Sequence, residues 1–168
     1  MTSPLSFDPS VVPAEPLSTE RFRLAPLGPE HNESDFDAWM SSIDHIRATP
    51  GFIPGAALAV GWPTPMTSEE NLSDLVNHAD EFTRGVAYAF TILDPHTGDI
   101  IGCTYIDPDE SQPDRSTEVE TTPTTRCATV TCWVRASHAE LDEPVVAALK
   151  HWLASSWNLA QFTFPGRD

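Results

Sequence analysis

Residues 129–157, TVTCWVRASHAELDEPVVAALKHWLASSW, decide the fold class of this chain. The alternation of Val130, Cys132 and Val134 predicts a strand that ends at Arg135, because successive side chains of a strand point to opposite faces. A short polar loop follows, and the apolar spacing from Asp142 onward predicts an amphipathic helix. The side chains expected on its buried face are Val145, Leu149, Trp152, Leu153 and Trp157.

A junction of strand, loop and helix commonly holds an anionic cofactor. The first turn of a helix has free backbone N–H groups and the positive end of the helix dipole. This loop, however, contains no glycine and carries Glu140, Asp142 and Glu143. The architecture therefore indicates a cofactor site, whereas the charges in the loop oppose an anion there.

The rest of the chain adds strands and helices around this junction. Strands are predicted at 21–27, 86–93, 100–106 and 161–164, and two amphipathic helices at 36–46 and 68–82. Thr67 and Glu70 form a capping box, and Gly98 lies in a turn that predicts a hairpin. The buried stripe expected on the second helix is Leu72, Leu75, Val76, Ala79 and Phe82. The predicted order is β-α-α-β-β-β-α-β, a mixed α/β sheet with an antiparallel central meander.

Composition divides the chain into an arm and one domain. Residues 1–19 are rich in Pro and Ser and predict an extended N-terminal arm, and residues 20–168 are enough for a single core. Two segments stand out within the domain. Residues 47–66 form a Gly- and Pro-rich loop with enough apolar side chains to pack against the core, and residues 107–127 form an acidic insertion expected to be solvated.

The net charge of −16 excludes several classes of partner. Nucleic acids and anionic membranes need clustered Lys and Arg, which this sequence lacks. A cationic partner such as a small amine would be attracted, although acidity also serves solubility alone. The three cysteines form no CxxC pair and lack zinc-ligand spacing with the histidines, so no metal site is predicted. Without a signal sequence or a long apolar run, we expect a reduced, cytoplasmic protein.

The element order and several local runs resemble the GNAT superfamily of N-acetyltransferases. The runs are FRLAPL at 22–27, the helix that begins EENL at 69–72, GDIIGCTYI at 98–106 and CWVR at 132–135. The pattern G-x-x-I-G-x-x-Y-I is moderately specific, and the resemblance covers about residues 21–164. It implies a GNAT-like domain that uses acetyl-CoA to acetylate a small amine by direct attack of the amine on the thioester.

The resemblance also implies site residues. The backbone of Val134, Arg135, Ala136 and Ser137 would hold the pantetheine arm, and Arg135 or His138 would meet a phosphate. The candidates for the catalytic base that removes the proton from the amine are Tyr105, Glu120 and His138. Each of these three also has a structural interpretation, since aromatic residues favour strands in any case.

Two departures from the family pattern support an alternative. The family's Q/R-x-x-G-x-G/A loop is replaced by AELDEP at 139–144, which has neither a basic residue nor a glycine. The final helix and strand pair of the family do not follow Phe164, so a partner chain would supply that surface, or it is absent. The alternative is a non-catalytic domain that has lost acetyl-CoA binding and serves as a ligand-binding or homo-oligomeric module. An exposed edge with Phe162 and Phe164 would favour a homodimer.

Overall fold

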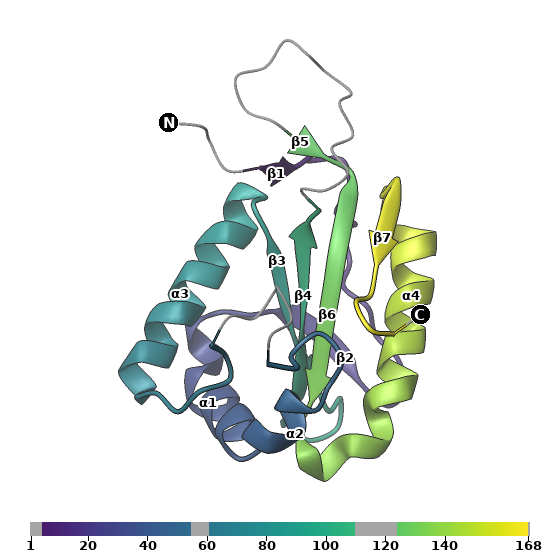
Figure 1. Cartoon of the computed structure of the whole chain (residues 1–168). Coiled ribbons are helices and arrows are strands. Elements are labelled where there is room, and N and C mark those ends of the chain that lie inside the picture. Colours follow the sequence, from purple (N-terminus) through teal and green to yellow (C-terminus); the bar gives the residue numbers. More distant parts are fainter. Residues whose placement is uncertain (1–4, 55–60, 110–123, 168) are drawn as a thin grey trace.

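The computed structural model describes residues 5–54, 61–109 and 124–167, and its core is a five-stranded sheet (Figure 1). The strands are β2 (Arg23–Pro26), β3 (Tyr88–Leu93), β4 (Ile100–Pro108), β6 (Cys127–Val134) and β7 (Gln161–Thr163), in the spatial order β2-β3-β4-β6-β7. The first three pairs are antiparallel, and β6 and β7 are parallel. The predicted mixed α/β sheet with an antiparallel meander is confirmed.

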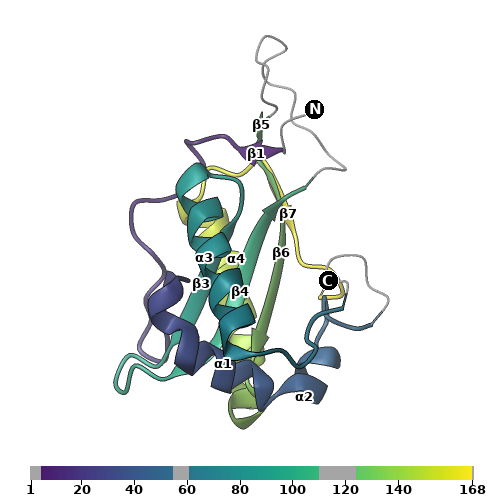
Figure 2. The same ribbon diagram turned by 90° about the vertical axis from the view of Figure 1, so that its left-hand side faces the viewer.

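Helices cover both faces of this sheet, giving three layers (Figures 1 and 2). One face carries α1 (Asn32–Met40), α2 (Ile43–Arg47) and α3 (Ser68–Arg84), and the other carries α4 (Asp142–Ser156). Two short 3-10 helices, η1 (Pro29–His31) and η2 (Ala136–Leu141), precede α1 and α4. None of the helices in the described part of the chain combines the length and apolar character that a membrane span needs.

The alternation along β6 separates two hydrophobic cores. Val130, Cys132 and Val134 point toward α4, where all five side chains predicted for the buried face of that helix are buried. Trp133 points the other way and packs in a second core with Trp39 of α1. Successive residues of a strand face opposite sides, so one strand supplies both cores.

The N-terminal segment belongs to the α4 side of the molecule. β1 (Ser6–Phe7) pairs in parallel with β5 (Thr124–Thr125), forming a small second sheet. Phe7 and Val11, both within the predicted arm, are buried in the core against α4. Most of the predicted acidic insertion, residues 110–123, lies outside the described residues.

Two helix predictions need correction. The predicted helix at 36–46 is divided between α1 and α2 at Ser41 and Ser42, whose side chains bond to backbone groups: Ser41 Oγ donates to the Ala38 carbonyl, and Ser42 Oγ accepts from the Ala136 N–H. The buried stripe predicted for α3 is also wrong in part. Leu72 and Val76 are 40% and 51% exposed, whereas the polar Asn71 is buried beside Leu75. Because hydrogen bonds satisfy the side-chain amide of Asn71, this polar residue can lie on the buried face of α3.

The capping box and the hairpin are confirmed. The backbone N–H of Glu70 donates to Thr67 Oγ1 at 3.1 Å, and the N–H of Thr67 donates to Glu70 Oε2 at 2.8 Å. Gly98 takes a left-handed φ of 77° in the turn between β3 and β4. In β4, Gly102 lies opposite Val134, and a Cβ atom there would sit 2.0 Å from the Trp133 carbonyl oxygen.

We therefore expect Gly102→Ala to lower the free energy of unfolding by about 3 kcal/mol, because backbone atoms of β6 would have to move. The matched control is Gly98→Ala, where a Cβ atom meets no neighbour and only the left-handed backbone is strained, at about 1 kcal/mol. Urea unfolding of both variants measures the difference. Equal stability of the two variants would show that the contact between β4 and β6 is looser than described.

Candidate functional site

A pocket of about 340 Å³ lies on the α1 and α3 side of the sheet. Its size is within the range of pockets that bind small molecules. α1, α3, β4, β6 and the chain between α2 and α3 each contribute to its wall. The lining residues are Leu27, Asp35, Trp39, Gly51, Phe52, Trp62, Asn71, Asp74, Leu75, His78, Tyr105, Asp107 and Thr131.

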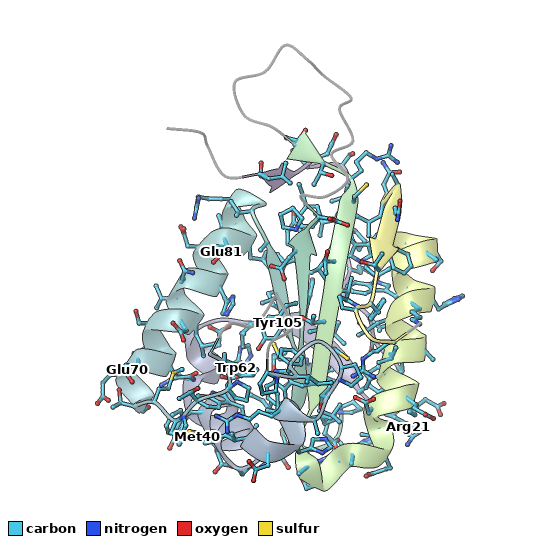
Figure 3. All side chains as sticks on the ribbon, in the orientation of Figure 1. Arg21, Met40, Trp62, Glu70, Glu81 and Tyr105 are labelled. Carbon is cyan, nitrogen blue, oxygen red and sulfur yellow. The ribbon has the colours of Figure 1, made fainter. Side chains whose placement is uncertain are left out.

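Aromatic rings form much of the wall. The ring of Trp62 lies 5.5 Å from Trp39, 5.6 Å from Phe52 and 6.4 Å from Tyr105, measured between centroids. Figure 3 shows Trp62 and Tyr105 on the α3 side of β6. Phe52 and Trp62 come from the loop that the sequence predicted to pack against the core. These rings give the pocket an apolar surface with negative π faces, which suits apolar chains and cations.

The base of the pocket holds a buried carboxyl group, Asp35, which is 4% exposed. Asn71 Nδ2 donates to Asp35 Oδ2 at 3.1 Å, and Trp39 Nε1 donates to Asn71 Oδ1 at 3.0 Å. Within the described ranges, Asp35 Oδ1 has no hydrogen-bond partner, and no Lys, Arg or His pairs with this carboxyl group. Burial raises the pKa of Asp35 to about 6, so the group is mostly ionised at neutral pH.

Three further titratable side chains line the pocket. Burial raises the pKa of Asp107 to about 6, and the nearby charge of Glu81 contributes. Burial lowers the pKa of His78, and this effect outweighs the charges of Glu81 and Asp74, which act to raise it. The imidazole is therefore mainly neutral at neutral pH. Asp74 is exposed on α3. The described lining thus contains three carboxyl groups and neither Lys nor Arg.

Of the two predicted catalytic residues that the structure describes, Tyr105 lines this pocket and His138 does not. Tyr105 contributes its ring, but its hydroxyl accepts from Trp133 Nε1 at 3.1 Å. Desolvation raises the pKa of Tyr105 well above its ordinary value, which disfavours a role as base. His138 lies on η2, where its Nδ1 pairs with Ser137 Oγ at 2.9 Å, and it does not line the pocket. Glu120 lies outside the described residues.

Three of the backbone N–H groups at residues 134–138 donate hydrogen bonds within the protein. The N–H of Arg135 donates to the Ile101 carbonyl at 2.7 Å, that of Ala136 to Ser42 Oγ at 2.9 Å, and that of His138 to the Arg135 carbonyl at 2.9 Å. Val134 is fully buried and pairs with Gly102. The Arg135 guanidinium lies 3.4 Å from Asp37 of α1. Cofactor binding by residues 134–138 remains a prediction, and these bonds reduce the number of donors available for it.

A buried arginine occupies the edge of β6 next to these residues. β7 pairs with β6 only from Cys127 to Thr129, so the rest of β6 extends beyond it. There the side chain of Arg167, 10% exposed, donates two hydrogen bonds to Asp142 at 2.7 and 2.9 Å and one to the Cys132 carbonyl at 3.3 Å. Lys150 Nζ donates to the Arg167 carbonyl at 3.1 Å. These hydrogen bonds connect Asp142, the first residue of α4, to β6 at the part of its edge that β7 does not cover.

Sequence reasoning missed the polar part of the pocket. Asp35 and Asn71 lie within amphipathic helix patterns, where a polar residue is normally assigned to the solvent face. One signal was present: Asn71, Leu75, His78 and Phe82 recur at spacings of four and three, which places them on one helical face. A polar residue within such a stripe indicates a buried polar group with a partner.

Comparisons with known proteins identify the fold. No protein-family model and no curated protein match the sequence. Solved structures do match in three dimensions. The ribosomal L7/L12 alpha-N-protein acetyltransferase RimL, solved with coenzyme A, has a TM-score of 0.65 and 13% identity, and the match covers 89% of this chain and 73% of that one.

Two other acetyltransferases give similar results. The microcin C7 self-immunity acetyltransferase MccE, solved with acetyl-CoA and AMP, has a TM-score of 0.59 and 11% identity, over 95% of this chain and 74% of that one. An acetyltransferase from Agrobacterium tumefaciens has a TM-score of 0.52 and 19% identity, over 87% of this chain and 70% of that one. The chain has the GNAT fold, as its resemblance predicted, and the structures that share this fold are acetyltransferases.

The buried carboxyl group of Asp35 has a measurable effect on stability. An aspartate titrates near 3.8 when exposed, and burial raises the pKa of Asp35 to about 6. The folded state binds this proton more tightly than the unfolded state, so the contribution of Asp35 to stability falls as pH rises from about 4 to about 6. We expect Asp35→Asn to raise the free energy of unfolding at neutral pH by about 3 kcal/mol and to flatten this pH dependence.

Urea unfolding across this pH range measures the effect, with Asp44→Asn, an exposed carboxyl on α2, as the control. A destabilised Asp35→Asn variant at neutral pH would show that the ionised carboxylate is well compensated in the folded protein.

Proposed function

We propose that this protein binds a small amine, as its ammonium cation, in the pocket between α1, α3 and the sheet. One observation carries the proposal: the ionised carboxyl group of Asp35 is buried at the base of an aromatic-walled pocket, with no cationic partner among the described residues. An unpaired buried charge is costly, and a bound ammonium group would compensate it. Asp107 and Asp74 add negative potential to the same pocket.

The aromatic wall supports the same ligand class. Trp39, Phe52, Trp62 and Tyr105 surround an apolar volume that can accept the carbon skeleton of an amine. Indole and phenol faces also attract cations, by about 1–2 kcal/mol in a desolvated site. Anionic ligands are disfavoured, since no Lys or Arg of the described residues lines the pocket.

In this proposal the protein is a ligand-binding member of a fold otherwise used for acetylation. Arg167 and Asp142 lie at the edge of β6 that β7 does not cover, close to residues 134–137, whose backbone the resemblance assigns to the pantetheine arm. Opening this edge would separate a largely buried ion pair, and removing one partner of such a pair typically costs about 3–5 kcal/mol. Glu140 and Glu143 add repulsion toward a pyrophosphate in the loop.

A second candidate function is acetyl-CoA-dependent N-acetylation of the same amine. The neutral imidazole of His78 favours it, because it lines the pocket and lies 5.7 Å from Tyr105, between ring centroids. Thr131 also brings β6, the strand assigned to acetyl-CoA by the resemblance, into the pocket wall. In this reaction His78 would accept a proton from the ammonium, and the amine nitrogen would form a bond to the thioester carbonyl carbon. The C–S bond would break, and the thiolate would take up the second proton, which the nitrogen loses on becoming an amide.

Calorimetric titration with n-butylamine tests the first proposal, with n-butanol as an uncharged ligand of similar shape. We expect saturable binding of the amine and none of the alcohol. Asp35→Asn should weaken amine binding by roughly 10- to 100-fold, as expected for the loss of a charge-assisted hydrogen bond. Asp44→Asn should leave it unchanged.

The same titration should depend on pH. Asp35 and Asp107 both have a pKa raised to about 6, so affinity should increase as pH rises through that range and both groups lose protons. Burial lowers the pKa of His78, and loss of its proton as pH rises removes a positive charge from the pocket, so this histidine acts in the same direction. Equal affinity for butylamine in wild type and Asp35→Asn would contradict the proposal.

Titration with CoA and acetyl-CoA separates the two candidate functions. We expect no binding up to about millimolar ligand, because the loop is acidic and the Arg167–Asp142 pair lies at the edge of β6. The amine titration on the same sample shows that the protein is folded and competent. Micromolar binding of acetyl-CoA, together with a mass increase of the amine by one acetyl group, would establish the acetyltransferase instead.

A further inference from the structure

The pocket carries acidic groups at both of its ends. We propose that its preferred ligand is a linear α,ω-diamine, with one ammonium group near Asp35 and the other near Asp107. This inference rests on the amine-binding function proposed above and specifies the class of amine.

The geometry of β4 separates the two ends. Cys103, Tyr105 and Asp107 alternate onto the face that carries α1 and α3, so Cys103 and Asp107 lie about 13 Å apart along the strand. Asp35 lies near the start of α3, where Asn71 donates to it at 3.1 Å, and its charge acts on both Cys103 and Tyr105. Asp107 lies at the opposite end of this row of residues, where the negative charge of Glu81 helps to raise its pKa.

α3 runs beside the pocket, and two of its residues mark the same two ends. Asn71, which holds Asp35, and Glu81, which acts on Asp107, are ten residues apart, or about 15 Å along a helix. His78 contributes to the lining between them. In Figure 3, Glu70, which precedes Asn71 in the sequence, and Glu81 lie toward opposite ends of α3. The strand and the helix therefore indicate one elongated pocket with a carboxyl group at each end.

Between the two ends the lining is mainly apolar, although the exposed Asp74, between Asn71 and His78 on α3, also lines the pocket. Leu75, Trp62 and the ring of Tyr105 line it, and His78 is uncharged there. A methylene chain fits this surface, because it removes apolar area from water without leaving a polar group unsatisfied. A monoamine would neutralise one end only. An amino acid would bring a carboxylate toward Asp107 or Asp35, which like-charge repulsion disfavours.

Calorimetric titration with diaminoalkanes from propane to decane, each compared with the monoamine of equal carbon number, tests the inference. We expect affinity to pass through a maximum at one chain length and to exceed that of the matched monoamine by about tenfold or more, since a second charge-assisted hydrogen bond forms. Asp107→Asn should reduce diamine affinity more than monoamine affinity. Asp44→Asn is the control that should change neither, and thermal unfolding checks that each variant is folded.

The outcomes distinguish this inference from the function on which it rests. If monoamines and diamines bind equally at every chain length, or if Asp107→Asn weakens both classes to the same extent, the two-ended ligand is wrong and amine binding stands. If neither class binds, the proposed function fails together with the inference.

Discussion

The side-chain amide of Asn71 joins the elements that build the pocket. It accepts a hydrogen bond from Trp39 Nε1 and donates to Asn32 Oδ1 and Asp35 Oδ2, so it ties α3 to α1 in an interior where each of these groups would otherwise lack a partner. Loss of a buried partner costs the desolvation free energy of the group left behind. The network thereby fixes the rotation of α3, exposes Leu72 and Val76, and holds the carboxyl group of Asp35 at the base of the pocket.

The two sides of β6 have different chemistry. On the α1 and α3 side, the pocket that Thr131 lines contains aromatic rings and three carboxyl groups, with neither Lys nor Arg among its described lining residues. At the free edge of the same strand, Arg167 is already compensated by Asp142 and by the Cys132 carbonyl. The charges of Arg167 and Asp142 therefore satisfy each other at this edge. Asp35, by contrast, accepts a hydrogen bond from the neutral amide of Asn71 and has no cationic partner among the described residues.

The fold of this chain and a cofactor site depend on different residues. The architecture agrees with acetyltransferases over most of the chain, with TM-scores up to 0.65 among the structures compared, although their sequences share 11–19% identity. Strand pairing and core packing depend on the pattern of apolar residues and tolerate many substitutions. A cofactor site depends on individual groups, such as glycines that expose backbone N–H donors. The pattern is kept here, whereas those groups are replaced.

From the sequence alone it was possible to predict the order of the five strands of the main sheet, the capping box at Thr67, the hairpin at Gly98 and the buried face of α4, because each depends on local spacing and local hydrogen bonds. The sequence also indicated that the loop before α4 lacks glycines and carries charges that oppose a pyrophosphate. Only the tertiary structure decided which face of α3 is buried, that Asp35 lines a pocket, and that Arg167 reaches Asp142. Those depend on contacts between residues far apart in the chain, where a polar side chain is buried only because a distant partner satisfies it.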